Sequence, residues 1–137
     1  MEFSELLATG QAVKRLQHRH HHALDSRLRK IGTSLSQWDA LRHVAGSPGA
    51  STHELAQMTF MTDQSFGALA IKLAEQGLIA RTQGRGRVVH HRITPEGTAL
   101  LEEAASITEK VMSESFAPLS AAERRSLRTL LERVLAG

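Results

Sequence analysis

The sequence predicts a mainly helical fold with one small β-hairpin, an α+β arrangement within a single chain of 137 residues. Most of the chain repeats apolar residues at intervals of three and four, which is the spacing of one buried helix face. Between residues 79 and 93 this pattern gives way to two short β-prone runs, 79–83 and 88–93. They flank Gly84-Arg85-Gly86-Arg87, where the glycines permit the positive φ of a tight hairpin.

Residues 5–30 are predicted to form one long helix that stops at Gly32. At about 1.5 Å per residue it would extend roughly 39 Å, which is longer than one small domain can cover. The next helix is expected to begin at Ser36, with Asp39 three residues later, and to end at residues 46–49. Its expected buried side consists of Trp38, Leu41, Val44 and Ala45.

Two short helices should follow, because Ser51 and Glu54 have capping-box spacing and Thr62 can cap a second helix. Gly77 and Leu78 are placed to end that second helix in a Schellman turn. Two helices joined in this way form a helix-turn-helix, whose second helix can enter the major groove of DNA. Its predicted apolar stripe is Phe66, Leu69, Ala70 and Leu73, and its predicted outer face is Gln64, Ser65, Gly67, Ala68, Ile71 and Lys72.

The hairpin is basic, and its run from Ile79 to Thr94 contains no acidic residue. A tip that carries Arg85 and Arg87 suits contact with phosphates or the minor groove. A basic hairpin can also be merely a solvated edge that blocks strand aggregation. The helix-turn-helix and the hairpin, in this order and spacing, point to DNA more specifically than either does alone.

Two amphipathic helices are predicted after the hairpin. Thr94-Pro95-Glu96 begins the first, Pro118 ends it, and Ser120 with Glu123 caps the second. Together with the N-terminal helix they carry more apolar surface than one small domain can bury. We expect a second copy of the chain to cover this surface; the alternative is that the two ends pack only on each other.

The chain resembles the MarR family of winged helix-turn-helix transcription regulators. The resemblance rests on Glu54-Leu55-Ala56, on Leu73-x-x-x-Gly77-Leu78-Ile79-x-Arg81, and on Arg87 followed by Ile93-Thr94-Pro95-Glu96-Gly97. It implies a dimer, DNA binding through the helix that begins near Thr62, and a wing at residues 83–89. The family commonly has an Asp-x-Arg pair in the wing, whereas here Arg87 follows Arg85, and this hairpin is shorter than is usual.

These observations predict a helical dimerisation region at residues 1–33 and 95–137, and a winged helix-turn-helix at 34–94. The function predicted is that of a homodimeric repressor that binds double-stranded DNA at a near-palindromic operator. The resemblance further implies a small aromatic effector that releases the DNA. The residues expected to contact DNA are Gln64, Ser65, Ala68, Lys72, Arg81, Arg85 and Arg87. The candidate effector-binding residues are His20, Leu24, Trp38 and His43, although a lone tryptophan such as Trp38 is more often a core anchor than a ligand platform.

Two other functions stay open from the sequence. His18 and His22 are four residues apart and could grip a metal ion, which would make the protein a metal-responsive regulator. The second alternative is a winged-helix module that binds proteins instead of DNA. No nucleophile elbow, phosphate loop or carboxylate pair indicates an enzyme, and no cofactor is expected.

Composition narrows the possibilities further. The chain has no cysteine, which excludes disulfides, cysteine-ligated zinc and thiol-based redox sensing. A formal charge of +3 tilts the expected partner toward an anion. We find neither a membrane-spanning run nor a signal peptide, and therefore expect a cytoplasmic location.

Overall fold

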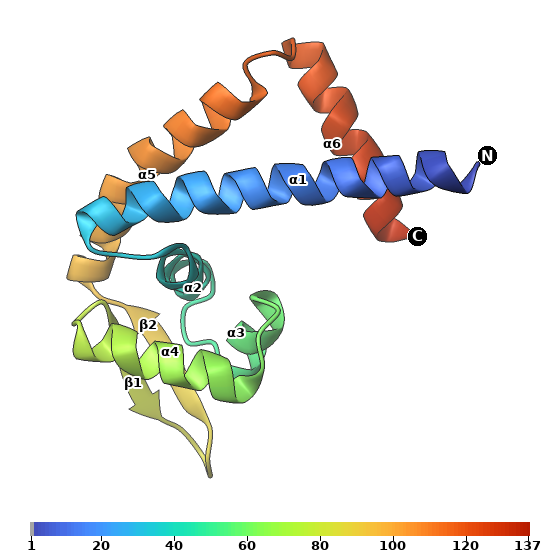
Figure 1. The fold of residues 1–137 in the computed structure, drawn as a ribbon. Coiled ribbons are helices and arrows are strands. Elements are labelled where there is room, and N and C mark those ends of the chain that lie inside the picture. The colour runs from blue at the N-terminus through green and yellow to red at the C-terminus, as the bar shows by residue number, and fades with distance from the viewer. Residues whose placement is uncertain (1) are drawn as a thin grey trace.

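A computed structural model describes residues 2–137 and confirms the predicted fold class, which is mostly helical with a two-stranded antiparallel hairpin. Figure 1 shows the long N-terminal helix running across the molecule, with the hairpin and the helices that precede it on one side. The helix that follows the hairpin runs along the other side, and the last helix returns and crosses the N-terminal helix in this view. The elements are α1 (Phe3–Leu28), η1 (Arg29–Ile31), α2 (Leu35–Gly46), α3 (Thr52–Met58), α4 (Asp63–Glu75), β1 (Ile79–Gln83), β2 (Val89–Ile93), α5 (Pro95–Phe116) and α6 (Ala121–Ala136).

Two hydrophobic clusters hold the protomer together. The larger fills the lobe made by α2, α3, α4 and the hairpin, and its largest fully buried side chain is Phe66. The smaller joins α1 to α5, so it ties the lobe to the helices from the chain ends. Its buried members are Leu24, Leu28, Ala104 and Val111.

The helix starts predicted from capping residues are confirmed at four places. Ser51 and Ser120 each form a full capping box with a glutamate, at Glu54 and Glu123 respectively. Hydrogen bonds from the backbone hold each of these glutamates and lower the pKa of its carboxyl group below the ordinary value of 4.5. The side chains of Thr62 and Thr94 cap α4 and α5.

The predicted start of α2 at Ser36 is wrong, because the helix is capped by Ser34. The Ser34 hydroxyl accepts a hydrogen bond from the Gln37 backbone N–H at 3.2 Å. The Leu35 N–H donates to the Asp25 carboxylate of α1 at 2.9 Å, and this contact satisfies the first turn two residues earlier than expected.

The buried side of α2 differs in part from the prediction. Leu41 and Val44 are fully buried as expected, whereas Trp38 and Ala45 are only half-buried. Gln37 and Ala40 occupy the buried positions instead, because the stripe that faces the core follows the spacing 37, 40, 41, 44. Trp38 flanks this stripe, packs against the smaller cluster and carries the Arg42 guanidinium 5.2 Å from its ring centroid.

The end of α4 and the hairpin follow the prediction closely. Gly77 has φ +78°, and the Leu78 N–H donates to the Leu73 carbonyl at 3.0 Å, which is the Schellman turn expected there. Strands β1 and β2 pair antiparallel from Ile79 opposite Ile93 to Gln83 opposite Val89. The segment that leads into α3 extends this pairing, because Ser51 forms an antiparallel β-bridge with His90 of β2.

The tip of the hairpin differs from the prediction in the conformation of its glycines. The prediction that both glycines have positive φ is wrong, since only Gly86 does, at +63°, and β2 begins one residue later than predicted. Gly84 leaves room for a different neighbour: a Cβ atom there would lie 2.6 Å from the imidazole of His90, which would have to shift. The tip is therefore closed by one turn glycine and one packing glycine.

Phe60, in the turn between α3 and α4, is the one non-glycine residue among 2–137 with positive φ (+58°), and its side chain is 98% exposed. A left-handed conformation costs a residue with a Cβ about 1–2 kcal/mol, and glycine loses about 0.5–1 kcal/mol more chain entropy than alanine on folding. We therefore expect Phe60→Gly to raise the free energy of unfolding, by about 1 kcal/mol or less. Urea unfolding at fixed protein concentration measures this change. Phe60→Ala is the control, because alanine keeps the backbone strain. A midpoint for Phe60→Gly below that of the wild type would contradict the prediction.

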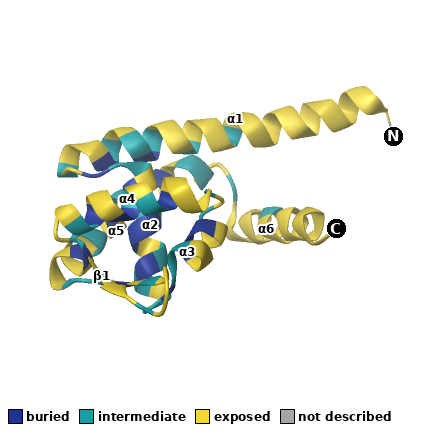
Figure 2. Ribbon diagram, turned by 90° about the horizontal axis from the view of Figure 1, so that it is seen from below, coloured by how far each residue is buried: buried dark blue, intermediate teal, exposed yellow. Residues whose placement is uncertain are grey.

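The helices at both ends of the chain expose apolar side chains to solvent. Figure 2 shows that the N-terminal half of α1 and nearly all of α6 are exposed, while the buried positions gather in the lobe. Helix α6 has no buried residue, even though it is rich in apolar side chains. Val134 and Leu135 are 79% and 85% exposed. The alternative that the ends cover each other thus fails within one protomer. No helix among residues 2–137 has both the length and the hydropathy needed to cross a bilayer.

Candidate nucleic-acid interface

Helix α4 is fixed on one side and open on the other. Phe66, Ala70 and Leu73 are fully buried in the lobe. The Thr62 hydroxyl accepts from the Ser65 N–H at 3.0 Å and donates to the Ser65 hydroxyl at 2.9 Å, so the first turn is rigidly capped. The opposite side of the helix faces solvent at Gln64, Ser65, Ala68, Ile71 and Lys72.

Gly67 lies on the edge of this open side and is half-buried. A Cβ atom at Gly67 would meet the Thr52 methyl group of α3 at 3.9 Å, which is ordinary van der Waals contact. The exposed face of α4 therefore carries small or hydrogen-bonding residues at 64, 65, 67 and 68, followed by Ile71 and one cation, Lys72, nearer its C-terminal end. A surface of this kind can approach base edges closely.

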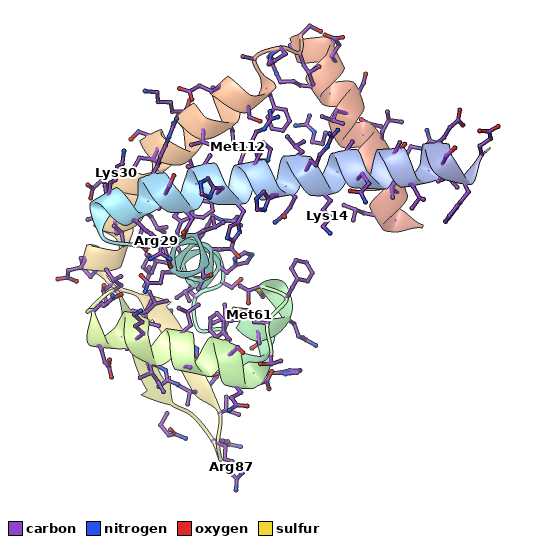
Figure 3. The ribbon with its side chains drawn as sticks, in the orientation of Figure 1. Lys14, Arg29, Lys30, Met61, Arg87 and Met112 are labelled. Atoms are coloured by element: carbon purple, nitrogen blue, oxygen red, sulfur yellow. The ribbon has the colours of Figure 1, made fainter. Side chains whose placement is uncertain are left out.

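The hairpin carries its cations to the outermost point of the lobe. Figure 3 shows Arg87 at the end of the wing farthest from α1. Arg85 and Arg87 are exposed, and the Gln83 side-chain amide donates to the Gly86 carbonyl at 2.9 Å, which braces the turn between them. Arg81 lies deeper, half-buried on the face of the sheet that packs on α4.

An acidic group lies beside the N-terminal end of the open face. Asp63, in the first turn of α4, has its carboxylate 3.0 Å from Nδ1 of His53 on α3. Both side chains are more than 60% exposed, so this pair contributes little to stability.

The four candidate effector residues do not converge on one cavity. His20 lines a cavity of about 230 Å³ between α1 and α5, together with Ala23, Val111 and Ser115. Leu24 is buried in the smaller core cluster, and Trp38 lies on α2 against it. The remaining candidate, His43, is also on α2, where its Nδ1 bonds the Asp39 carbonyl at 2.7 Å.

His20 has the most distinctive surroundings of the four. Its Nε2 lies 2.6 Å from the Ser115 hydroxyl, and its ring meets the edge of Phe116 with the centroids 5.3 Å apart. Burial lowers the pKa of His20 below 6.5, and the charge of Arg19 lowers it further. The imidazole is therefore held in its neutral form near pH 7.

The histidine tract on α1 does not assemble into a metal site by itself. His18, His21 and His22 are exposed. Within residues 2–137, no group of three or more His, Cys, Asp or Glu side chains is arranged to hold a metal ion. A metal at His18 and His22 would need ligands from outside the protomer.

Sequence reasoning missed His91, which is fully buried between the hairpin, α4 and the chain entering α3. Its ring lies edge-on to Phe66 with the centroids 6.0 Å apart, and Nδ1 is 3.0 Å from the Ala50 carbonyl. The signal available in the sequence was its position in β2, since residues 89, 91 and 93 alternate on the inward face.

Comparison with known proteins agrees with this geometry. A family model described as MarR family matches residues 31–87. The HTH-type transcriptional repressor Rv2887 of Mycobacterium tuberculosis is 29% identical over 109 residues, which cover 78% of each protein. Over these residues the chain is similar to members of the MarR family. The proteins that it resembles are named as transcriptional repressors or regulators.

Solved structures of MarR proteins share the fold. A probable transcriptional regulator from Pseudomonas aeruginosa superposes with a TM-score of 0.79 at 27% identity, covering 91% of this chain and 95% of that one. Rv2887 in complex with DNA gives 0.76 at 26% identity, with the same coverages. A mutant MarR from E. coli bound to operator DNA gives 0.87 at 19% identity, covering 98% and 99%, and shows the fold alone.

Proposed function

We propose that the protein is a homodimeric repressor that binds a near-palindromic operator through α4 and the wing and is released by a small aromatic effector. The observation that carries the proposal is the combination of one open, small-faced side of α4 with an arginine-tipped hairpin on the same lobe. It is supported by the curated relatives, which are named as transcriptional repressors, and by the complex of Rv2887 with DNA. Binding of an operator inside the cell implies a cytoplasmic location.

The proposed DNA contacts divide into two kinds. Gln64, Ser65 and Ala68 would meet base edges in the major groove, where an amide reads adenine and the alanine methyl contacts thymine. The outer face of α4 has no arginine, so guanine reading there should be weak and DNA shape should contribute more. The cations proposed for phosphates or the minor groove are Lys72, Arg81, Arg85 and Arg87.

Dimerisation is proposed through the helices at the chain ends. Helix α1 exposes an apolar row at its N-terminal end, where Phe3 is 73% exposed and Leu6 and Leu7 are each 52% exposed. At the corner of α5 and α6, a cavity of about 620 Å³ is bordered by apolar groups and three arginines: Phe116, Ala121, Arg124, Arg125, Leu127, Arg128 and Leu131. Glu2 and Glu5 flank the apolar row of α1, so the N-terminal end of α1 from a second copy is complementary to this corner in both polarity and charge.

The effector is proposed to bind near the junction of α1, α2 and α5, where Leu24 and Trp38 lie in one cluster. His20 borders its own cavity beside this junction, and His43 lies farther along α2, so these two candidates would meet the ligand only if it extends beyond the junction. The support comes from Rv2887, whose structures include complexes with salicylic acid and with p-aminosalicylic acid. A ligand can release DNA only by binding one arrangement of the two lobes better than the other. Residues on the helices between the lobes and the chain ends are placed to sense that arrangement.

Replacing Arg87 with alanine tests the wing. The exposed guanidinium should neutralise one phosphate, so its loss should weaken binding to all duplexes and reduce the slope of log affinity against log salt by about 0.9. Fluorescence anisotropy with labelled genomic fragments at several salt concentrations measures both. Lys30→Ala is the matched control, because Lys30 is an exposed cation far from the wing (Figure 3). Equal affinities and slopes for Arg87→Ala and the wild type would remove the wing from the interface.

A further inference from the structure

His91 is a buried titratable group that the proposed DNA contacts do not use. Its side chain is fully buried, and it reaches three separate elements. It packs edge-on against Phe66 of α4, it bonds the Ala50 carbonyl before α3, and it lies opposite Arg81 in the hairpin. These are the parts whose mutual placement decides whether α4 and the wing can lie on one duplex.

The contacts define the protonation state of the ring. A carbonyl oxygen only accepts, so Nδ1 of His91 must donate its hydrogen to the Ala50 carbonyl 3.0 Å away. In the neutral ring this leaves a lone pair on Nε2, and the Arg81 Nε–H donates to it at 3.4 Å. An arginine has no acceptor of its own, so this contact exists only while Nε2 is unprotonated.

We propose that His91 is a positioning residue that holds the Arg81 guanidinium between the wing and α4 for contact with DNA. The inference rests on the proposed function, because it takes Arg81 to be one of the DNA contacts. Arg81 is half-buried on the inward face of β1, and a long side chain there would otherwise sample many rotamers. The Nε2 lone pair fixes the Nε–H and leaves the two terminal nitrogens of the guanidinium free to meet a phosphate.

Acid should release this arrangement. Burial lowers the pKa of His91 below its ordinary value of 6.5, and the charges of Arg81 and His90 lower it further, although the bond to Ala50 raises it. Phe66 of α4 and the Ala50 segment contribute no charge to its contacts. Once Nε2 gains a proton it can no longer accept from Arg81, and two cations face each other. Arg81 is then free to leave its position.

Two substitutions separate the two bonds of the ring. In His91→Gln the side-chain oxygen can occupy the place of Nε2 and accept from Arg81, while the bond to Ala50 is lost. In His91→Asn the amide can occupy the place of Nδ1 and donate to the Ala50 carbonyl, while the acceptor for Arg81 is lost. Both variants lose the ring contact with Phe66, so they are matched in the packing that they remove.

Operator affinity is measured at several salt concentrations for the wild type, both His91 variants, Arg81→Ala, and Arg81→Ala combined with His91→Asn. We expect His91→Gln to keep the wild-type salt slope, and His91→Asn to lose about 0.9 of slope, as Arg81→Ala does. The double variant should bind no more weakly than Arg81→Ala alone. Equal slopes for the two His91 variants, or a full additive loss in the double variant, would overturn the proposal.

The pH dependence of operator affinity distinguishes the proposed role from a role in packing alone, because packing alone would give no dependence on the charge of His91. Every titratable group other than His91 is common to both proteins, so the ratio of wild-type to His91→Gln affinity isolates His91. We expect this ratio to fall severalfold as the pH is lowered from 7 toward 5. A constant ratio would overturn the proposal.

Nitrogen-15 NMR of labelled histidines tests the contact in proteins whose His91 is intact, should both His91 variants prove unfolded. The wild type should show the tautomer with hydrogen on Nδ1. Arg81→Ala should raise the titration midpoint of His91, because it removes the neighbouring charge. The other tautomer, or an unchanged midpoint, would contradict the inference. If Arg81→Ala has the wild-type salt slope while Arg87→Ala does not, the positioning role fails and the proposed function stands.

Discussion

Glutamate at both Val134 and Leu135 should convert the dimer into monomers and lower operator affinity on the order of 10²–10⁴-fold. The two side chains are 79% and 85% exposed in the protomer, so the substitutions disturb no core within it. In the proposed dimer they would place two charges in an apolar interface. A monomer then binds each half-site separately and loses the effective concentration that the second lobe provides, which accounts for the size of the loss.

The matched control is a variant with glutamate at Ser126 and Thr129. These residues are exposed on the opposite side of α6 and add the same charge to the same helix. Sedimentation equilibrium gives the oligomeric state, and anisotropy gives the affinity. A Val134/Leu135 variant that stays dimeric with wild-type affinity, or a control that dissociates equally, would contradict the proposed interface.

Phe66→Ala should destabilise the lobe by about 3–5 kcal/mol, which is the usual cost of removing a buried phenylalanine. Phe66 is the largest fully buried side chain in the protomer, and it supports both α4 and the imidazole of His91. Domains of this size are stable by about 5–15 kcal/mol, so the substitution removes a large share. We expect a lower unfolding midpoint in urea than for the wild type, and a loss of operator affinity that is larger at 37 °C than at 15 °C, because a destabilised lobe is unfolded to a greater extent at the higher temperature.

Phe60→Ala provides the comparison for Phe66→Ala, since Phe60 is 98% exposed. Its unfolding free energy should stay within about 0.5 kcal/mol of the wild type. Both variants must be measured at one protomer concentration, because dimerisation contributes to the apparent stability. Similar losses in the two variants would mean that the lobe core is not organised around α4.

The parts of the fold that depend on nearby residues could be predicted from the sequence. A capping serine or threonine and its partner lie within four residues, so the starts of α3, α4, α5 and α6 follow from local chemistry. The hairpin register follows from the alternation of its two runs. The start of α2 could not be predicted in this way, because the choice between Ser34 and Ser36 is made by Asp25, ten residues earlier on another helix.

The residues of the candidate site likewise divide into those that local patterns predict and those that depend on tertiary packing. Helical periodicity alone indicated which side of α4 is open, and glycine spacing located the wing tip. His91 was missed because its partner at Ala50 lies 41 residues away and is brought close only by the pairing before α3. The effector residues are harder still, since His20 on α1 and His43 on α2 depend on how three helices pack.

The most direct test of the account is hydroxyl-radical footprinting of the wild-type protein on a duplex selected from genomic fragments. One surface formed by α4 and the wing, presented twice, should protect two symmetric sets of sugars with centres about 34 Å apart, roughly one helical turn. The Arg85→Ala, Arg87→Ala double variant should lose the minor-groove part of both sets together. A single protected set, or no protection even at low salt, would contradict the account.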